Sequence, residues 1–265
     1  MPRLRSSSDR SIDHDRATCL YLEQLLSRDS MMRLSSLLIP GFFALLTAFA
    51  PTVFALPDSD LRIIQEVKDE WETAFYTLPQ DQQEPVLKTL SMKADTLIQR
   101  FPDVAEPYLV AGLIQCSLAA NEGGFSALGR VKKARQLVQQ AMNKNPLAMD
   151  GSGYVILGNL YYRLPGWPLS FGDNKVARSY LETAIRLYPD GLDTNYFYGD
   201  FLLDEGDATA ALPYLEKADK APIRALSRLS DMKLKEELKV SLKNAREGKG
   251  ESLGFYNQFL NAIGK

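Results

Sequence analysis

Apolar residues recur every three or four positions from residue 58 onward, which is the period of an amphipathic α-helix. The pattern predicts one helix over residues 58–78, capped by Asp58 or Ser59, and a second helix over residues 81–100. The residues expected to face inward from these two helices are Leu61, Ile64, Val67, Trp71, Ala74, Phe75, Leu78, Val86, Leu87, Leu90, Ala94, Leu97 and Ile98. Residues 56–104 are therefore expected to form an N-terminal helical pair.

Small residues recur at fixed places in the helices that follow, and residues 154–189 carry the clearest copy. Its first helix has an aromatic residue, then Leu-Gly, then Tyr, and its second has Ala, Leu, Ala and Pro. Small side chains at Gly158 and Ala184 would let two antiparallel helices cross closely, and Pro189 would end the second helix. Related sets recur upstream at Tyr108, Ala111, Gly112, Ala134, Val138, Ala141 and Pro146, and downstream at Asn195, Tyr198, Gly199, Leu202, Gly206, Ala211, Leu215 and Ala218.

This order of residues resembles that of tetratricopeptide (TPR) repeats over roughly residues 85–222. The resemblance implies an all-α fold, a TPR-like α-solenoid of antiparallel helix pairs, with three repeats over residues 105–222. Residues 223–265 are expected to form C-terminal capping helices, a long amphipathic one and then a short one. The apolar positions of the long helix are Leu226, Leu229, Met232, Leu234, Leu238 and Leu242. The family pattern describes how helices pack and leaves open what they bind.

Two insertions distinguish the first two repeats from a compact TPR unit. Residues 121–130 and 163–173 each lengthen the connection between the paired helices, and both stretches contain glycine and aromatic residues. Such connections project from the same edge of a helical stack, so we expect two neighbouring enlarged loops. Phe125, Trp167 and Phe171 then have two interpretations: they cover the hydrophobic core, or they form the walls of a ligand or partner pocket between the loops. Asp173 is expected to cap the following helix.

The first 55 residues differ from the rest of the chain. Residues 1–30 are polar without a periodic apolar face, and we interpret them as a disordered or untranslated extension. Residues 31–55 begin with a basic residue, continue with an apolar run and end with small residues, the order of a secretory signal peptide. We therefore expect an exported protein of the bacterial periplasm. Alternatively, residues 34–55 remain uncleaved as a membrane anchor, and only then would the membrane be a partner.

The composition of the chain argues against several kinds of chemistry. His14 is the only histidine and lies in the N-terminal extension, so a processed chain would have no imidazole for general-base catalysis or metal binding. Cys116 would be its only cysteine, and we interpret it as a buried apolar residue. A net charge of -2 gives no general attraction to nucleic acid. We predict no enzyme activity, no catalytic residues, no cofactor, no metal and no nucleic-acid partner.

The TPR resemblance also implies a concave groove lined by the first helix of each repeat, where a peptide can lie. The positions expected to face this groove are Leu109, Leu113, Val155, Asn159, Tyr162, Tyr196, Asp200 and Leu203. TPR domains that clamp a C-terminal carboxylate carry Lys, Arg and Asn at such positions. Here only Asn159 fits, and Asp200 would repel a carboxylate, so an apolar segment is the expected ligand. The other interpretation is that several of these residues form the core between repeats.

Two functions follow as hypotheses. The first is a non-enzymatic exported TPR scaffold that binds a protein or peptide partner in the cell envelope. The second is a small-molecule-binding accessory protein of a periplasmic transport system, with a small apolar ligand. The second hypothesis draws on the segments 165–168, Pro-Gly-Trp-Pro, and 171–173, Phe-Gly-Asp, which look similar to the TatT-type TPR helper of periplasmic TRAP transporters.

Overall fold

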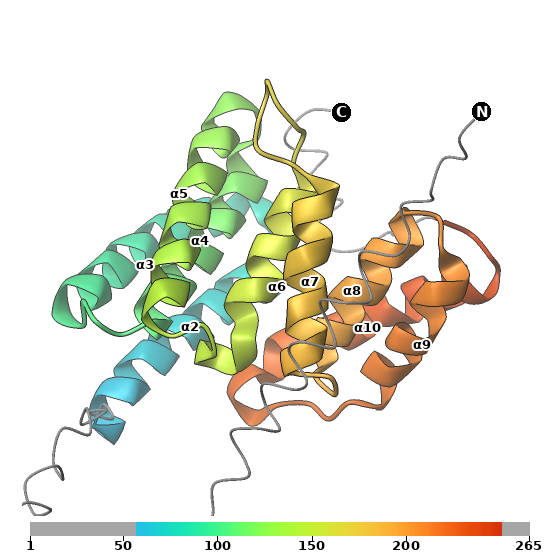
Figure 1. Cartoon of the computed structure of the whole chain (residues 1–265). Helices are drawn as coiled ribbons and strands as arrows, with labels where there is room; N and C mark the ends of the chain where they lie inside the picture. The colour runs from blue at the N-terminus through green and yellow to red at the C-terminus, as the bar shows by residue number, and fades with distance from the viewer. Residues whose placement is uncertain (1–56, 251–265) are drawn as a thin grey trace, which may run out of the picture. The chain divides into compact units, whose positions relative to one another are not determined.

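The computed structural model describes residues 57–250, and these residues are helical with no β-strand among them. The elements are α2 Asp58–Thr77, α3 Gln80–Arg100, α4 Glu106–Glu122, α5 Gly124–Lys144, α6 Ala148–Arg163, α7 Asn174–Leu187, α8 Leu192–Asp204, α9 Ala208–Lys220, the 3-10 helix η1 Ala225–Ser227 and α10 Arg228–Arg246 (Figure 1). Each helix packs against the next along the chain. The predicted all-α helical-repeat fold is confirmed. The predictions for residues 1–55 and for the short final helix lie outside the described residues.

Three glycines set the crossing of the three helix pairs α4–α5, α6–α7 and α8–α9. A Cβ built at Gly112 would lie 2.7 Å from Cγ2 of Val138, one at Gly158 would lie 2.6 Å from Cγ of Leu181, and one at Gly199 would lie 2.8 Å from Cδ2 of Leu215. Real Cβ atoms essentially never approach other atoms so closely. The same contact at the same place in each pair bears out the expectation that small residues mark the helix crossings.

The helix starts agree only in part with the sequence. Asp173 caps α7 as predicted, because its carboxylate accepts hydrogen bonds from the backbone N–H groups of Lys175 and Val176. The predicted cap of α2 is wrong, because Asp58 lies inside the first turn, after Pro57, and no side chain caps that end. A carboxylate in the first turn still stabilises the helix, since it lies near the positive end of the helix dipole.

The predicted enlarged loop over residues 121–130 is wrong. α4 continues to Glu122 and α5 begins at Gly124, so the extra residues lengthen both helices instead of forming a loop. Gly123 (φ 66°) and Gly124 (φ 55°) both have a positive φ, which glycine adopts readily and which lets the chain reverse in one step. Nη2 of Arg130 lies 2.6 Å from Oε1 of Glu122 and holds the lengthened ends together. Phe125 is therefore part of α5, and no pair of neighbouring loops exists here.

The second insertion forms the predicted loop, between Leu164 and Asp173, and it extends beyond the helix ends at the top of Figure 1. The backbone N–H of Asp173 donates to the carbonyl of Tyr161 at 2.8 Å, and that of Gly172 donates to Pro165 at 2.9 Å. A Cβ at Gly172 would lie 1.8 Å from the carbonyl oxygen of Leu164. Only glycine allows this close approach, so the loop has a defined course.

Some predicted inward positions are exposed. Leu61 of α2 and Val86 of α3 face solvent, and so do Leu226 of η1 and Met232 of α10. In contrast, Leu238 and Leu242 of α10 are buried, as are Leu87, Leu90 and the other inward residues at the centres of α2 and α3. The predicted inward positions are correct in the middle of each helix. They are wrong near helix starts, where fewer neighbouring helices are available to cover a side chain.

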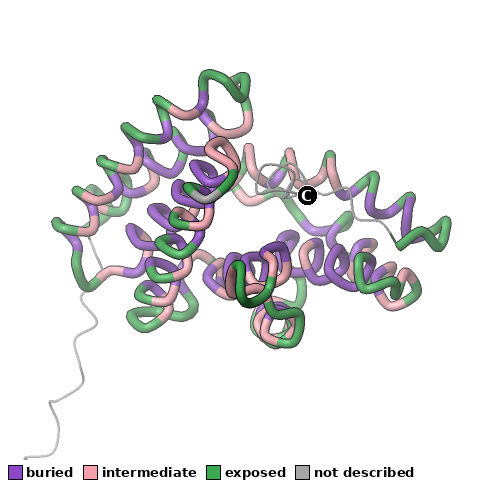
Figure 2. Tube along the Cα trace, turned by 90° about the horizontal axis from the view of Figure 1, so that it is seen from above, coloured by how far each residue is buried: buried purple, intermediate pink, exposed green. Residues whose placement is uncertain are grey.

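The C-terminal helix returns to the N-terminal one. α10 packs against α9, α8 and α2, and the helices of residues 57–250 follow a curve when seen from above (Figure 2). Lys68 Nζ and Gln65 Nε2 of α2 donate to the carbonyl of Leu226 at 2.7 and 2.9 Å. α10 thus bridges the beginning and end of the row of helices. None of the helices within residues 57–250 has the length and apolar character needed to cross a lipid bilayer.

Candidate functional site

A cavity of about 170 Å³ lies where the first helices of the pairs meet α2 and the η1–α10 segment. We call it the central cavity; Trp71, Phe75, Leu113, Val155 and Phe197 are among the residues that line it. These residues come from α2, α4, α6 and α8, so the cavity lies on the side of the repeats where the groove was expected. Three predicted contact residues, Leu113, Val155 and Asn159, belong to its lining.

An aromatic wall forms the α2 side of the central cavity. The rings of Trp71 and Phe75 stack with centroids 5.9 Å apart and an interplanar angle of 12°, and Tyr76 lies edge-on to both. Trp71 Nε1 donates a hydrogen bond to Ser117 Oγ at 2.8 Å, which fixes the indole against α4. The sequence identified Trp71 as the anchor of the first helix and missed its place in a cavity. The spacing of Trp71 and Phe75, four apart on one helix face, was the available signal.

A buried ion pair lies on the same helix, beside the aromatic wall. Lys68 and Glu72, both almost fully buried, are bonded to each other. Lys68 also donates to the carbonyl of Leu226, and Glu72 accepts from the backbone N–H of Ser230 at 3.4 Å. These bonds satisfy two charges that would be costly to bury alone. They also join α2 to the η1–α10 segment that covers the cavity.

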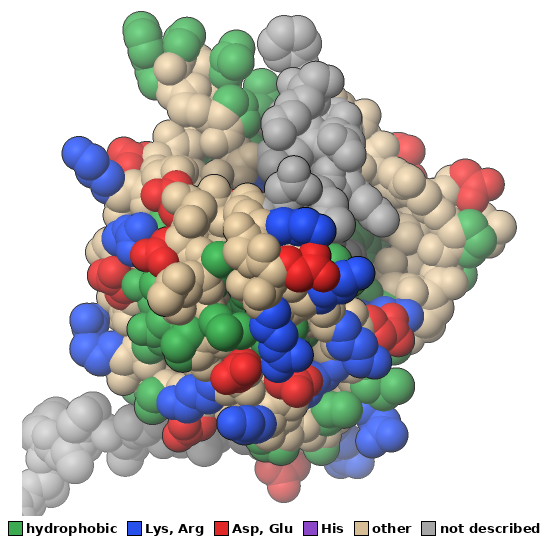
Figure 3. Space-filling view, turned by 90° about the vertical axis from the view of Figure 1, so that its right-hand side faces the viewer, with side chains coloured by type: hydrophobic (Ala, Val, Ile, Leu, Met, Phe, Trp, Pro, Cys, Tyr) green, Lys and Arg blue, Asp and Glu red, His purple; other side chains and the backbone are tan. Residues whose placement is uncertain are grey.

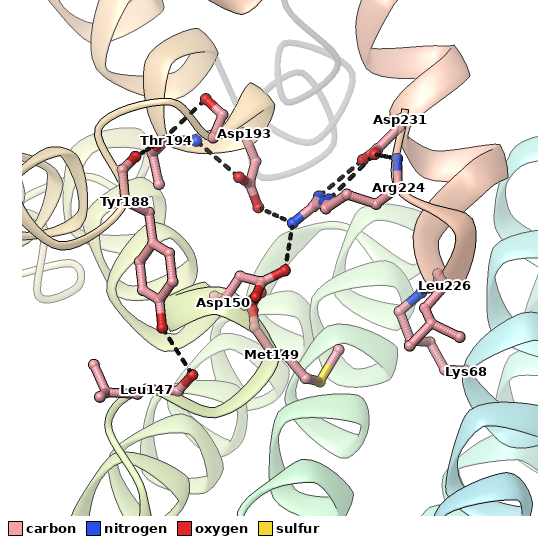
Figure 4. Close-up of polar contacts among 12 residues, drawn as sticks. Lys68, Leu147, Met149, Asp150, Tyr188, Asp193, Thr194, Arg224, Leu226 and Asp231 are labelled. Carbon is pink, nitrogen blue, oxygen red and sulfur yellow. Dashed lines mark hydrogen bonds and ion pairs between the residues drawn. The ribbon is translucent and has the colours of Figure 1, made fainter. Parts of the chain in front are cut away.

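Arg224 occupies the centre of a second charged cluster in the cavity wall (Figure 4). Its Nη2 lies 2.8 Å from Oδ1 of Asp231, and its Nη1 lies 3.1 Å from Asp193 and 3.6 Å from Asp150. Asp231, only 1% exposed, also accepts from the backbone N–H and Nε of Arg224. Burial raises the pKa of Asp193, and the Arg224 cation partly counteracts that rise. The cluster ties the starts of α6, α8 and α10 together.

A left-handed turn lies within the first residues of α6. Met149, Asp150 and Gly151 have φ values of 50°, 54° and 70°, a conformation that non-glycine residues rarely adopt. A Cβ at Gly151 would lie 2.6 Å from the ring of Tyr188, whose hydroxyl donates to the carbonyl of Leu147 at 3.1 Å (Figure 4). The turn lets Met149 line the cavity and Asp150 reach Arg224. Such strain is often found at binding sites, and Asp150-Gly151 was the sequence signal for it.

Cys116 is buried and free, as the sequence suggested, and it lines the central cavity. Burial raises the pKa of its thiol to about 12. The thiol is therefore neutral near pH 7 and acts as a small apolar group, because the thiolate is the nucleophilic form. Asn159 lines the same cavity, and its Nδ2 donates to the carbonyl of Val155 at 2.8 Å. Both side chains contribute shape and polarity to the site.

Most of the remaining groove positions are packed inside the protein, and on α8 the reason is that α10 covers its inner face. Tyr196 Oη donates to Glu237 at 3.2 Å, and Ser241 Oγ donates to Asp200 at 3.3 Å. Asp200 also pairs with the buried Arg163, so its charge is neutralised within the protein. Leu109 and Leu203 are buried as well, and Tyr162 bonds Asp204. For Leu109, Tyr196, Asp200 and Leu203 the core interpretation is correct and the groove interpretation is wrong, while Tyr162 is only partly buried.

The predicted aromatic residues of the insertions are separated. Phe171 packs against the core, with its ring 5.3 Å from that of Tyr161 and 4.1 Å from the guanidinium of Arg135. Trp167, at the tip of the same loop, is 90% exposed and covers no core. Phe125 lies on α5, which contributes no described residue to the central cavity. These three residues therefore do not form the expected pocket between two loops. The central cavity lies instead among the first helices of the repeats.

No family model matches the chain, and no curated protein matches it significantly.

Proposed function

We propose that this chain is a non-enzymatic, TPR-type binding protein whose central cavity holds a small, mainly apolar molecule. The observation that carries the proposal is the partly covered inner face: α10 packs on α8, and a cavity of about 170 Å³ remains against the aromatic wall. A cavity on the order of 150 Å³ accepts a molecule the size of benzene. A peptide segment needs a continuous groove along the first helices, and α10 interrupts it at α8, so the geometry favours the small-molecule hypothesis.

The proposal of a binding role, without catalysis, has support in the chemistry of the cavity wall. Cys116 is protonated near pH 7, and the carboxylates of Asp193 and Asp231 are held by Arg224. A nucleophile needs a neighbouring base, and a general base needs a free lone pair directed at its substrate. The described lining residues are arranged to fix one another, which suits a preformed binding site.

Export to the periplasm and a role beside a transport system belong to the same proposal. Their support is the signal-like order of residues 31–55 and the similarity of the loop sequence to TatT-type helpers. A protein that takes up a small apolar molecule in that compartment could deliver it to a membrane transporter. N-terminal sequencing of the exported protein tests the location: a chain that starts at Leu56 agrees, and one that retains residues before Leu34 contradicts it.

Native mass spectrometry tests the proposed cavity ligand. Protein purified from its own compartment should carry a small non-covalent adduct. Val155→Phe places a larger side chain in the cavity lining and should remove the adduct, while Val240→Phe, on the exposed face of α10, should retain it. Circular dichroism checks that both variants fold, and Ala120→Leu, another change in the lining, serves if Val155→Phe does not. An adduct that persists in a folded cavity variant contradicts the proposal.

A second candidate function, the protein-binding scaffold, is favoured by one observation. Trp167 and Leu169 at the tip of the α6–α7 loop are 90% and 65% exposed, and residues 164–172 carry no charge. Figure 3 shows hydrophobic side chains projecting at the top of the molecule, where this loop lies in Figure 1. Exposed tryptophan is typical of residues that dominate protein interfaces. This surface would bind an envelope protein or peptide independently of the cavity.

Affinity capture from envelope extracts with matched variants tests this second function. A specific partner should be recovered by the wild-type protein and by Val155→Phe, and it should be lost with Trp167→Ala. Recovery that is unchanged by Trp167→Ala contradicts binding through the loop.

A further inference from the structure

We infer that the ligand of the central cavity is an uncharged molecule built on a single flat aromatic ring. This inference rests on the proposed small-molecule function and specifies the chemical class of the ligand. Three properties of the central cavity lead to this inference: the pairing of the charges in its wall, the composition of the apolar side of its wall, and its volume.

The charges in the cavity wall are already paired within the protein. Lys68 is bonded to Glu72 and Leu226, and Arg224 is bonded to Asp231 and Asp193. Each of the four charged lining residues, Lys68, Arg224, Asp193 and Asp231, is thus bonded to a residue of opposite charge within the protein. A charged ligand would remain unpaired in the cavity, or it would have to break one of these buried pairs, and both are costly. An uncharged ligand avoids this cost.

The apolar side of the wall suits an aromatic ring. Trp71, Phe75 and Tyr76 already pack as a stacked and edge-on set, which a further ring can extend at the usual centroid spacing. Met149 and Cys116 also line the cavity, and sulfur atoms make favourable contacts with aromatic rings. Leu113, Val155 and Ile156 complete the apolar surface. A flat ring therefore gains contacts here that an aliphatic molecule of equal size does not.

The volume limits the ligand to about one ring. Cavities on the order of 150 Å³ hold benzene, whereas drug-sized ligands occupy sites of roughly 300–1,000 Å³. The cavity of about 170 Å³ is close to the benzene-sized cavity and below the range of drug-sized sites. Asn159 and Ser230 lie in the same wall, and their side-chain oxygens can accept a hydrogen bond from a single hydroxyl or amide substituent of the ligand.

Isothermal titration calorimetry with ring-matched compounds tests the inference on the full chain. Phenol is the uncharged aromatic probe, benzoate and benzylamine carry a negative and a positive charge, and cyclohexanol replaces the flat ring. Phenol should bind at least about tenfold more tightly than either charged compound, because an unpaired buried charge costs more than the 1.4 kcal/mol that corresponds to tenfold. It should also bind more tightly than cyclohexanol. Val155→Phe should abolish phenol binding, and Val240→Phe should leave it unchanged.

The outcomes separate this inference from the proposed function. Equal or tighter binding of benzoate or benzylamine overturns the uncharged class, and tighter binding of cyclohexanol overturns the aromatic ring. If none of the four binds while native mass spectrometry still detects a cavity adduct, the inference fails and the proposed function stands. If no probe binds and no adduct is found, both fail.

Discussion

Gly158 lies where α6 crosses α7, and its missing side chain determines how closely the two helices pack. Because an added Cβ would lie 2.6 Å from Leu181 Cγ, we expect Gly158→Ala to lower the free energy of unfolding by about 1–3 kcal/mol. Urea denaturation measures the change. Gly129→Ala is the matched control, since no atom lies within 4 Å of its added Cβ and alanine favours the α5 helix. Equal losses from both substitutions would show that the crossing does not depend on glycine.

Cys116 should make stability fall at alkaline pH. Folding raises the pKa of its thiol from an ordinary 9.0 to about 12, because burial disfavours the thiolate. The contribution of the neutral thiol to the free energy of unfolding is therefore present below pH 9 and is lost as the pH rises towards 12. We expect the loss of unfolding free energy between about pH 8 and about pH 11 to be smaller in Cys116→Ala than in wild type. Denaturation at both pH values measures it, and the tyrosines with raised pKa are common to both proteins. Identical losses would contradict the burial of this thiol.

At the scale of single residues, the sequence predicted which positions need a small side chain better than it predicted which groups bond the charged side chains. Gly112, Gly158 and Gly199 could be identified from spacing alone, because each acts within one helix pair. The bond of Lys68 to the carbonyl of Leu226 and the pair of Arg224 with Asp193 could not, because each joins residues that are far apart along the chain. Long-range pairs of this kind have no period along the sequence.

At the scale of elements, we expect one part of the α6–α7 loop to stabilise the fold and its exposed tip to contribute little to stability. Phe171 packs against Tyr161 and Arg135, so Phe171→Ala should lower the free energy of unfolding by about 1–3 kcal/mol. Trp167→Ala removes a side chain that is 90% exposed, so it should change the free energy of unfolding by no more than about 0.5 kcal/mol. Chemical denaturation of both variants checks this. A large loss with Trp167→Ala would mean that its indole covers the core after all.

The contact between α2 and the η1–α10 segment depends on the Lys68 and Glu72 pair. Lys68→Met leaves the buried Glu72 without its cation and should cost about 3–5 kcal/mol of unfolding free energy. The double variant Lys68→Met/Glu72→Leu removes both charges and should recover most of that loss. Thermal and urea denaturation of the three proteins measure the coupling. If the double variant is no more stable than the single one, the pair does not act as a unit.

The enlarged connections show what spacing can reveal about an element. Counting from the repeat pattern identified extra residues between α4 and α5 and between α6 and α7. The number of extra residues does not determine whether they lengthen the helices or form a loop between them. At residues 121–130 they continue it, because Gly123 and Gly124 reverse the chain and Arg130 pairs with Glu122. At residues 164–173 the two prolines and Gly172 favour a loop.

At the scale of the whole described region, α10 explains why the groove expectation failed. The sequence predicted an amphipathic capping helix, and the structure contains one. Its position against α2 and α8 follows from the summed curvature of all the preceding helix pairs, which no local pattern specifies. Tyr196 and Asp200 therefore contact α10 and are unavailable to a ligand. The central cavity is the part of the inner face that α10 leaves open.

The emission of Trp71 provides the most direct test of the claim that the central cavity binds a ligand. The chain has two tryptophans, so Trp167→Phe leaves Trp71, in the cavity wall, as the only reporter. Titration of this variant with phenol should change the Trp71 emission saturably, with the midpoint found by calorimetry, and adding Val155→Phe should abolish the change. Trp71 emission that stays constant while calorimetry records binding would place the ligand elsewhere and contradict the account.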